Sequence, residues 1–82
     1  MVDCYQKSKL EGYEIAVYEN AVYFTASCFL GVGKYERHEF DTEHDAVNYA
    51  AANPRCRPWG IYAVDANKHD TVCGLVRNAK YV

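Results

Sequence analysis

Apolar and polar side chains alternate along residues 13–29 with a period of two, as in a β-strand that buries one face. The alternation puts Tyr13, Ile15 and Val17 on one side of the first half. If residues 20 and 21 form a two-residue turn, the second half adds four side chains to that side, namely Val22, Phe24, Ala26 and Cys28. The pattern therefore predicts an antiparallel hairpin over residues 13–29 with one buried apolar face.

The other face of this predicted hairpin is aromatic and acidic. Tyr18 falls opposite Tyr23, with Glu14 on the same strand and Glu19 next to the turn. Paired tyrosines on a solvent-facing sheet surface are typical of protein-binding sites. The register depends on the turn, because Asn-Ala fits a type I′ geometry less well than Asn-Gly, and a slip of one residue would bury the tyrosines instead.

The rest of the chain predicts further strands and one helix. Residues 4–6 form a candidate edge strand, and the charged run at residues 34–40 is typical of another edge, since charges discourage pairing with other molecules. Asp41 or Thr42 caps a helix that ends near Asn53, before Pro54. Residues 59–66 and 71–77 are two β-rich runs separated by a polar turn.

These elements predict an α+β fold in one compact domain spanning residues 1–82. We expect an antiparallel β-sheet with one helix packed on one face, plus a C-terminal β-hairpin. A chain of 82 residues buries roughly 60 % of its unfolded surface and has no room for an enclosed active site. Since no nucleophile with an oriented base is recognisable, we expect no enzyme activity, no catalytic residues and no cofactor.

The four cysteines, at positions 4, 28, 56 and 73, are widely spaced and form no Cys-x-x-Cys pair. We expect free thiols, with Cys28 and Cys73 packed as small apolar residues. Their spacing from the three histidines indicates no metal site. No apolar stretch approaches the roughly 20 residues of a membrane span, and the first residues lack a secretion-signal pattern, so we expect a cytoplasmic protein without a membrane partner.

The net charge of −2 is divided unevenly along the chain. Residues 1–45 contain nine acidic and four basic side chains, whereas residues 46–82 contain two acidic and five basic ones. An acidic surface repels phosphate, so direct nucleic-acid binding by the aromatic face is not expected, and a basic protein surface is favoured as partner. Arg55, Arg57 and Trp59 form a basic and aromatic cluster of the kind that binds single-stranded RNA, and this alternative stays open.

Two segments resemble a known family. The run Ile-Ala-Val-Tyr-Glu-Asn at residues 15–20 is similar to a strand that leads into a hairpin in a type I-F anti-CRISPR family of small phage proteins. The run Arg-His-Glu-Phe-Asp-Thr-Glu at residues 37–43 is similar to that family's Arg-Asp-Phe-Asp-Ser-Thr-Glu run, which joins the last strand to the first helix. The resemblance covers residues 5–53.

The resemblance implies a non-enzymatic, phage-encoded inhibitor that works in the bacterial host cytoplasm. Its sheet would bind the backbone subunits of a CRISPR-Cas surveillance complex and block binding of target DNA. This chain departs from the family at three points: the turn is Asn-Ala instead of Asn-Gly, the loop before Lys34 is shorter, and residues 59–64 alternate where the family continues into a second helix.

Six side chains are therefore expected to contact a partner. The resemblance implies contacts for Tyr18 and, more loosely, Tyr5, and the family's acidic contact on the following strand falls near Phe29. The residue pattern adds Glu14, Glu19 and Tyr23, whose carboxylates and ring would meet a basic subunit that normally handles nucleic acid. A homodimer through the same tyrosines, or a generic protein-interaction domain, is the alternative.

Overall fold

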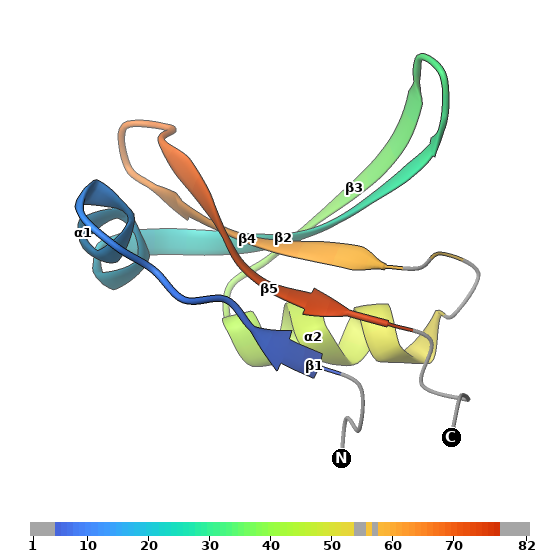
Figure 1. Ribbon diagram of the computed structural model, residues 1–82, viewed down its shortest axis with the longest axis horizontal. Helices are drawn as coiled ribbons and strands as arrows, with labels where there is room; N and C mark the ends of the chain where they lie inside the picture. Colours follow the sequence, from blue (N-terminus) through green and yellow to red (C-terminus); the bar gives the residue numbers. More distant parts are fainter. Residues whose placement is uncertain (1–4, 54–55, 57, 78–82) are drawn as a thin grey trace.

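The computed structural model describes residues 5–53, 56 and 58–77. They form a five-stranded antiparallel sheet with two helices (Figure 1), which confirms the α+β class. The strands lie in the order β1-β5-β4-β2-β3. The strands are β1 (Tyr5–Lys7), β2 (Ala21–Gly31), β3 (Lys34–Phe40), β4 (Trp59–Asp65) and β5 (Asp70–Val76), and the helices are α1 (Tyr13–Glu19) and α2 (Glu43–Ala52).

Helix α1 occupies the first half of the predicted hairpin. The strand expected over residues 13–19, the turn at residues 20–21 and the pairing of Tyr18 with Tyr23 are therefore wrong. Burial follows a helical spacing, because Val17 is buried and Glu14 and Tyr18 are half-buried, whereas Tyr13 is 71 % exposed. Alternation over seven residues was too short to separate the two periods.

Strand β2 carries the predicted inward face along most of its length. Phe24, Ala26 and Cys28 belong to or pack against the core, as expected. Val22 is 57 % exposed instead, because the pairing of β2 with β4 shifts register between Ala21 and Tyr23.

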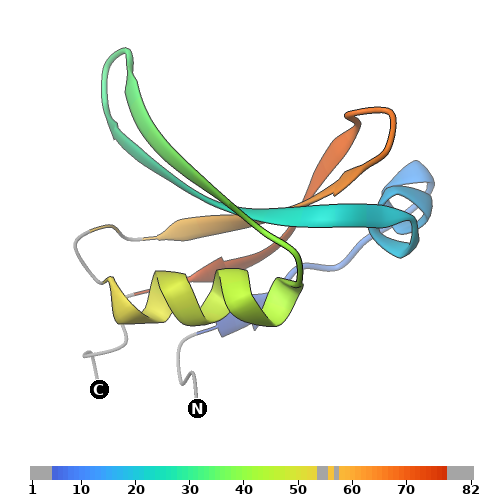
Figure 2. The ribbon, with the colours of Figure 1, turned by 180° about the vertical axis from the view of Figure 1, so that it is seen from behind.

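Helix α2 lies across one face of the sheet (Figure 2). The predicted cap is confirmed: the Thr42 side chain accepts a hydrogen bond from the Asp45 backbone N–H at 3.1 Å. Small side chains, Ala46 and Ala50, let the helix approach Trp59, which is fully buried and donates its indole N–H to the Asn53 carbonyl at 2.8 Å. The largest core side chain is thus fixed both by packing and by a hydrogen bond.

The opposite face of the sheet is open. Two hairpins, β2–β3 and β4–β5, curve away from α2 and give this face a saddle shape (Figures 1 and 2). Strand β4 pairs with β2 only as far as Ser27, whereas β3 pairs with β2 as far as Gly31. The end of the β2–β3 hairpin is therefore a two-stranded ribbon that extends beyond the rest of the sheet.

A disulfide joins Cys28 on β2 to Cys56 between α2 and β4, with the two Cα atoms 6.0 Å apart. The expectation of free thiols is therefore wrong for this pair, because the fold brings together two cysteines that are 28 positions apart in sequence. Cys73 is a buried free thiol, as expected, and Cys4 lies outside the described residues. Among the described residues, no helix has the length and apolar character needed to cross a membrane.

The disulfide should contribute strongly to stability. Breaking it by reduction, or by the double substitution Cys28→Ser and Cys56→Ser, should lower the free energy of unfolding by about 3 kcal/mol, because the unfolded chain regains the freedom of a closed loop. Urea unfolding followed by circular dichroism measures this, and reductant should have no further effect on the double variant. Equal stability of the oxidised and reduced protein would contradict the expectation.

Candidate functional site

Two of the expected contact residues, Tyr5 and Tyr18, converge on the carboxylate of Glu43 at the start of α2. The Tyr18 hydroxyl donates to Glu43 Oε1 at 2.5 Å, and the Tyr5 hydroxyl donates to Oε2. Lys7 Nζ lies 2.6 Å from Oε2 and 2.5 Å from the Tyr18 hydroxyl. We call these four residues the Glu43 junction; it ties β1 and α1 to α2.

The neighbours of Glu43 in this junction stabilise its charged form. Burial alone would raise the pKa of Glu43, but hydrogen bonds from Lys7, Tyr18 and Tyr5 outweigh it and hold the pKa below its ordinary value. Burial, together with the neighbouring carboxylate, raises the pKa of the Tyr5 phenol. Burial and the same carboxylate also raise the pKa of Cys73 to about 12, so this thiol is not an activated nucleophile.

The two expected acidic contacts belong to α1 and not to a sheet face. Glu14 Oε1 accepts a hydrogen bond from the Glu11 backbone N–H at 3.1 Å and so serves the start of the helix. Glu19 is exposed at the other end of α1. The prediction that Glu14 lies on a sheet strand and Glu19 at the end of that strand is therefore wrong.

Tyr23 and Phe29 are the expected contacts that the structure places on the open face. The Tyr23 hydroxyl accepts a hydrogen bond from Arg37 Nη2 at 3.3 Å, and Lys68 Nζ lies 5.8 Å from the centre of its ring. Phe29 is 73 % exposed and pairs with Tyr35 near the end of the β2–β3 hairpin. The two rings occupy different parts of the same face, because five residues of β2 separate them.

Tyr23 borders a recess of about 620 Å³ where β3 leads into α2. Its lining is acidic and apolar: Val22, Tyr23, Glu39, Phe40, Asp41 and Asp45. We call it the acidic recess. Its three carboxylates are solvent-exposed, so their negative charges can attract a cation and carry no desolvation penalty.

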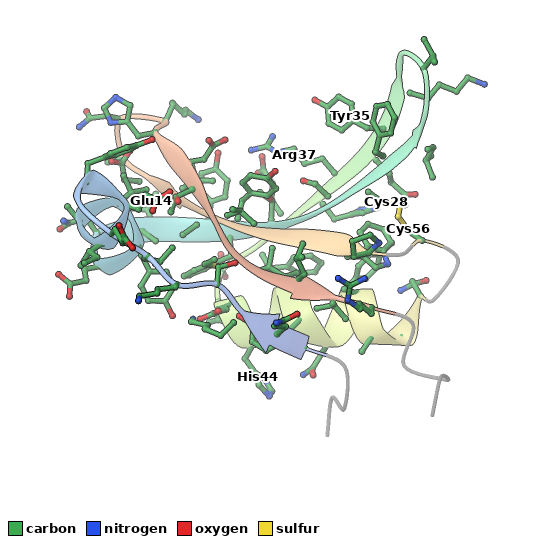
Figure 3. The ribbon with its side chains drawn as sticks, viewed as in Figure 1. Glu14, Cys28, Tyr35, Arg37, His44 and Cys56 are labelled. Carbon is green, nitrogen blue, oxygen red and sulfur yellow. A yellow bond between two sulfur atoms is a disulfide. The ribbon has the colours of Figure 1, made fainter. Side chains whose placement is uncertain are left out.

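A second recess, of about 650 Å³, lies between the two curved hairpins, and we call it the saddle recess. Its aromatic walls are Phe29, Tyr35 and Tyr62, and Figure 3 shows Tyr35 and Arg37 along β3. Thr25 and Ser27 supply hydroxyl groups to its floor. The recess is mixed in character, since it also includes Arg37 and Asp70.

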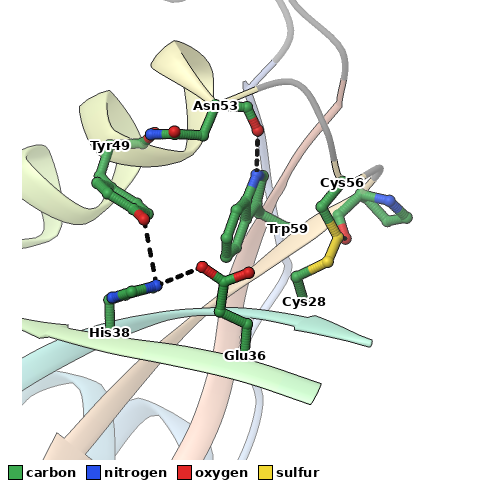
Figure 4. The surroundings of a disulfide bond; sticks show 8 residues. Cys28, Glu36, His38, Tyr49, Asn53, Cys56 and Trp59 are labelled. Carbon is green, nitrogen blue, oxygen red and sulfur yellow. Dashed lines mark hydrogen bonds and ion pairs between the residues drawn. A yellow bond between two sulfur atoms is a disulfide. The ribbon is translucent and has the colours of Figure 1, made fainter. Parts of the chain in front are cut away.

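A cluster of polar side chains around His38 lies beside the disulfide on the helix side of the sheet (Figure 4). His38 Nε2 is 2.6 Å from Glu36 Oε2 and 3.1 Å from the Tyr49 hydroxyl, and its ring lies 4.7 Å from the Tyr49 ring. The cluster links the edge strand β3 to α2. The sulfur atoms beside it are bonded to each other, so neither is available as a nucleophile for His38.

The single-stranded RNA alternative loses its aromatic element. Trp59 is fully buried and hydrogen-bonded, so its ring is not available to stack on a base. Arg55 and Arg57 lie outside the described residues. Within the described part of the chain, no three His, Cys, Asp or Glu side chains are grouped so that they could hold a metal ion.

Comparisons with protein-family models, curated proteins and solved structures found no match to this chain. Inferences about its function therefore rest on its own residues. Sequence reasoning missed the acidic recess, which needs the end of β3, the start of α2 and the bulged start of β2 to meet. The acidic run at residues 39–45 is the sequence signal from which it could have been predicted.

The Glu43 junction makes stability depend on pH. A carboxylate whose pKa is lowered by folding stabilises the protein above its unfolded pKa, and the contribution is lost as pH falls through the folded value. Glu43→Gln should therefore lower the free energy of unfolding by about 1–2 kcal/mol at neutral pH, and the difference should shrink below about pH 4.

Urea unfolding across this pH range measures the difference between wild type and variant. Glu39→Gln is the control, because Glu39 forms an exposed ion pair with Arg37 at 3.2 Å and should change stability by less than about 1 kcal/mol. A Glu43→Gln difference that stays constant with pH would contradict the role given to this carboxylate.

Proposed function

We propose that this protein is a non-enzymatic binding protein that uses the acidic recess and Tyr23 to dock on a basic surface of another protein. The particular target proposed is a nucleic-acid-handling subunit of a CRISPR-Cas surveillance complex, and binding would block access of target DNA. The protein would then act as a stoichiometric inhibitor, as the resemblance of residues 5–53 implies.

The acidic recess is the observation that carries the proposal. Three exposed carboxylates, Glu39, Asp41 and Asp45, surround apolar surface from Val22 and Phe40. A lysine or arginine of a partner can place its aliphatic stem on that apolar surface and its charge among the carboxylates. The same charges repel a phosphate backbone, which favours a protein partner over nucleic acid.

Only the second of the two similar runs contributes to the proposed binding site. The family has a strand where this chain has α1, so Tyr18 no longer corresponds to a contact on a sheet. The second similar run keeps its strand-to-helix arrangement, and it supplies Glu39 and Asp41 to the acidic recess. Binding is therefore assigned to Tyr23 and this junction, and Tyr5 and Tyr18 are assigned to the Glu43 junction.

The compartment is a testable part of the proposal. A target in the host cytoplasm would expose the Cys28–Cys56 disulfide to reducing conditions. The acidic recess lies at the opposite end of β2 from Cys28, so binding through it should survive reduction of the disulfide as long as the domain stays folded.

Tyr23→Ala should weaken binding to a purified type I-F surveillance complex by about 2 kcal/mol or more, because an aromatic anchor beside the carboxylates is lost. Asp41→Asn combined with Asp45→Asn should mainly slow association and reduce its dependence on salt. Biolayer interferometry measures both effects, and a mobility shift of labelled target DNA reports inhibition.

Tyr35→Ala is the matched control, since Tyr35 is an exposed tyrosine on the same face but outside the acidic recess. Tyr18→Phe tests whether Tyr18 contacts the partner, as the sequence resemblance implied, and should leave binding unchanged. Absence of binding to the complex rejects the CRISPR target. In that case affinity capture from bacterial lysate, compared between wild type and Tyr23→Ala, tests the wider proposal of a basic protein partner.

A further inference from the structure

The end of the β2–β3 hairpin exposes far more apolar surface than a water-facing turn needs. We call residues 29–35 the hairpin tip. Four of its side chains are largely exposed: Val32 is 99 %, Phe29 is 73 %, Tyr35 is 68 % and Leu30 is 53 % exposed. Single exposed apolar residues are ordinary, but four within seven positions form a patch that indicates an interaction.

The hairpin tip is a narrow projection. No pairing with β4 extends beyond Ser27, so only the two strands of the hairpin support the tip, and Figures 1 and 2 show it curving away from the body of the sheet. Val32 and Gly33 form the turn, and Gly33 has a φ of 72°, which glycine adopts without strain. Val32 therefore stands at the apex.

The exposed apolar side chains cover the apex of the tip as well as its strands. Phe29 and Tyr35 line the saddle recess, Val32 stands at the apex, and Leu30 lies where the pairing of β2 with β3 shifts register. A lipid interface can surround the apex and both strands of the tip together.

The size of the patch also favours lipid over a second copy of this chain. The four side chains present on the order of 500 Å², whereas a stable protein interface buries about 800 Å² on each partner. Two convex tips would bury still less against each other. A lipid bilayer is fluid and adapts to the shape of the tip, so it needs no complementary surface.

Charge along the molecule supports a particular orientation. Residues 20–35 contain no acidic side chain, and Lys34 lies at the tip. The next acidic residue along the chain is Glu36, whose Oε2 atom lies 2.6 Å from His38 Nε2. The acids of α1 and of the acidic recess lie toward the other end of the molecule, and Figure 3 shows Glu14 and Tyr35 at opposite ends. Anionic headgroups would attract the tip and repel the acidic end.

From these observations we propose that the hairpin tip inserts into the headgroup region of an anionic lipid bilayer. Insertion is shallow, because the backbone groups of the turn need water or headgroups as hydrogen-bond partners. The sequence predicted no membrane partner on the ground that no spanning segment exists, and a peripheral contact requires none. The proposal is independent of the basic-partner proposal, which uses the other end of β2.

Sedimentation with sucrose-loaded vesicles tests the proposal on the full chain. The protein should sediment with vesicles of phosphatidylcholine mixed with phosphatidylglycerol, and much less with phosphatidylcholine alone. Val32→Asp should reduce the bound fraction about tenfold, since a charge enters the most deeply inserted position. Lys34→Gln should weaken binding to the anionic vesicles only.

Val22→Asp is the matched control, because Val22 is also an exposed valine but lies at the other end of the hairpin, in the acidic recess. It should leave vesicle binding unchanged. A second readout uses Val32→Trp, whose fluorescence should shift to the blue on adding vesicles, while Val22→Trp should not respond. The native Trp59 is buried and gives a constant background.

Three results would overturn the proposal. One is absence of binding to anionic vesicles, and another is an equal effect of Val32→Asp and Val22→Asp. The third is a dimer in lipid-free solution, measured by sedimentation velocity, that Val32→Asp dissociates, because a second copy would then be the partner of the tip.

Discussion

The length and pairing of β2 decide the shape of this protein. At eleven residues, β2 is the longest strand, and its two neighbours pair with different parts of it. Strand β4 covers residues 21–27, and β3 covers residues 24–31. The middle of β2, paired on both sides, forms the core with α2. Each end is paired on one side only, and the two candidate binding regions, the acidic recess and the hairpin tip, lie at these ends.

The packing of α2 against the centre of β2 and β4 holds this arrangement. Trp59 and Ile61 on β4 are fully buried with Ala26 and Cys28 on β2, so this part of the sheet is closed to solvent by the helix. The disulfide and the hydrogen bond from Trp59 to Asn53 attach the end of α2 to the same core. The Glu43 junction attaches its beginning to β1 and α1. The helix is therefore fixed at both ends, and the open face is free for binding.

The tyrosines show how one residue type takes on different roles in one small domain. Tyr5 and Tyr18 donate hydrogen bonds to a half-buried carboxylate, and Tyr49 packs on Trp59 and His38. Tyr35 and Tyr23 lie on the open face. Aromatic composition alone could not separate these roles, because each depends on which charged or apolar group the fold brings near the ring.

Local sequence patterns were enough to predict the α+β class, the strand at residues 34–40, the capped start of α2 and the inward face of β2 from Phe24 to Cys28. These features depend on neighbours within a few positions: a Thr42 side chain that reaches the Asp45 N–H, and a period-two pattern sustained over a long strand. Three features depend on packing between distant segments: the helix at residues 13–19, the disulfide between Cys28 and Cys56, and the contacts of Glu43 with Tyr5, Tyr18 and Lys7. A seven-residue segment obtains most of its stability from what it packs against, and the other contacts join residues 25 to 38 positions apart, so no local pattern contains them.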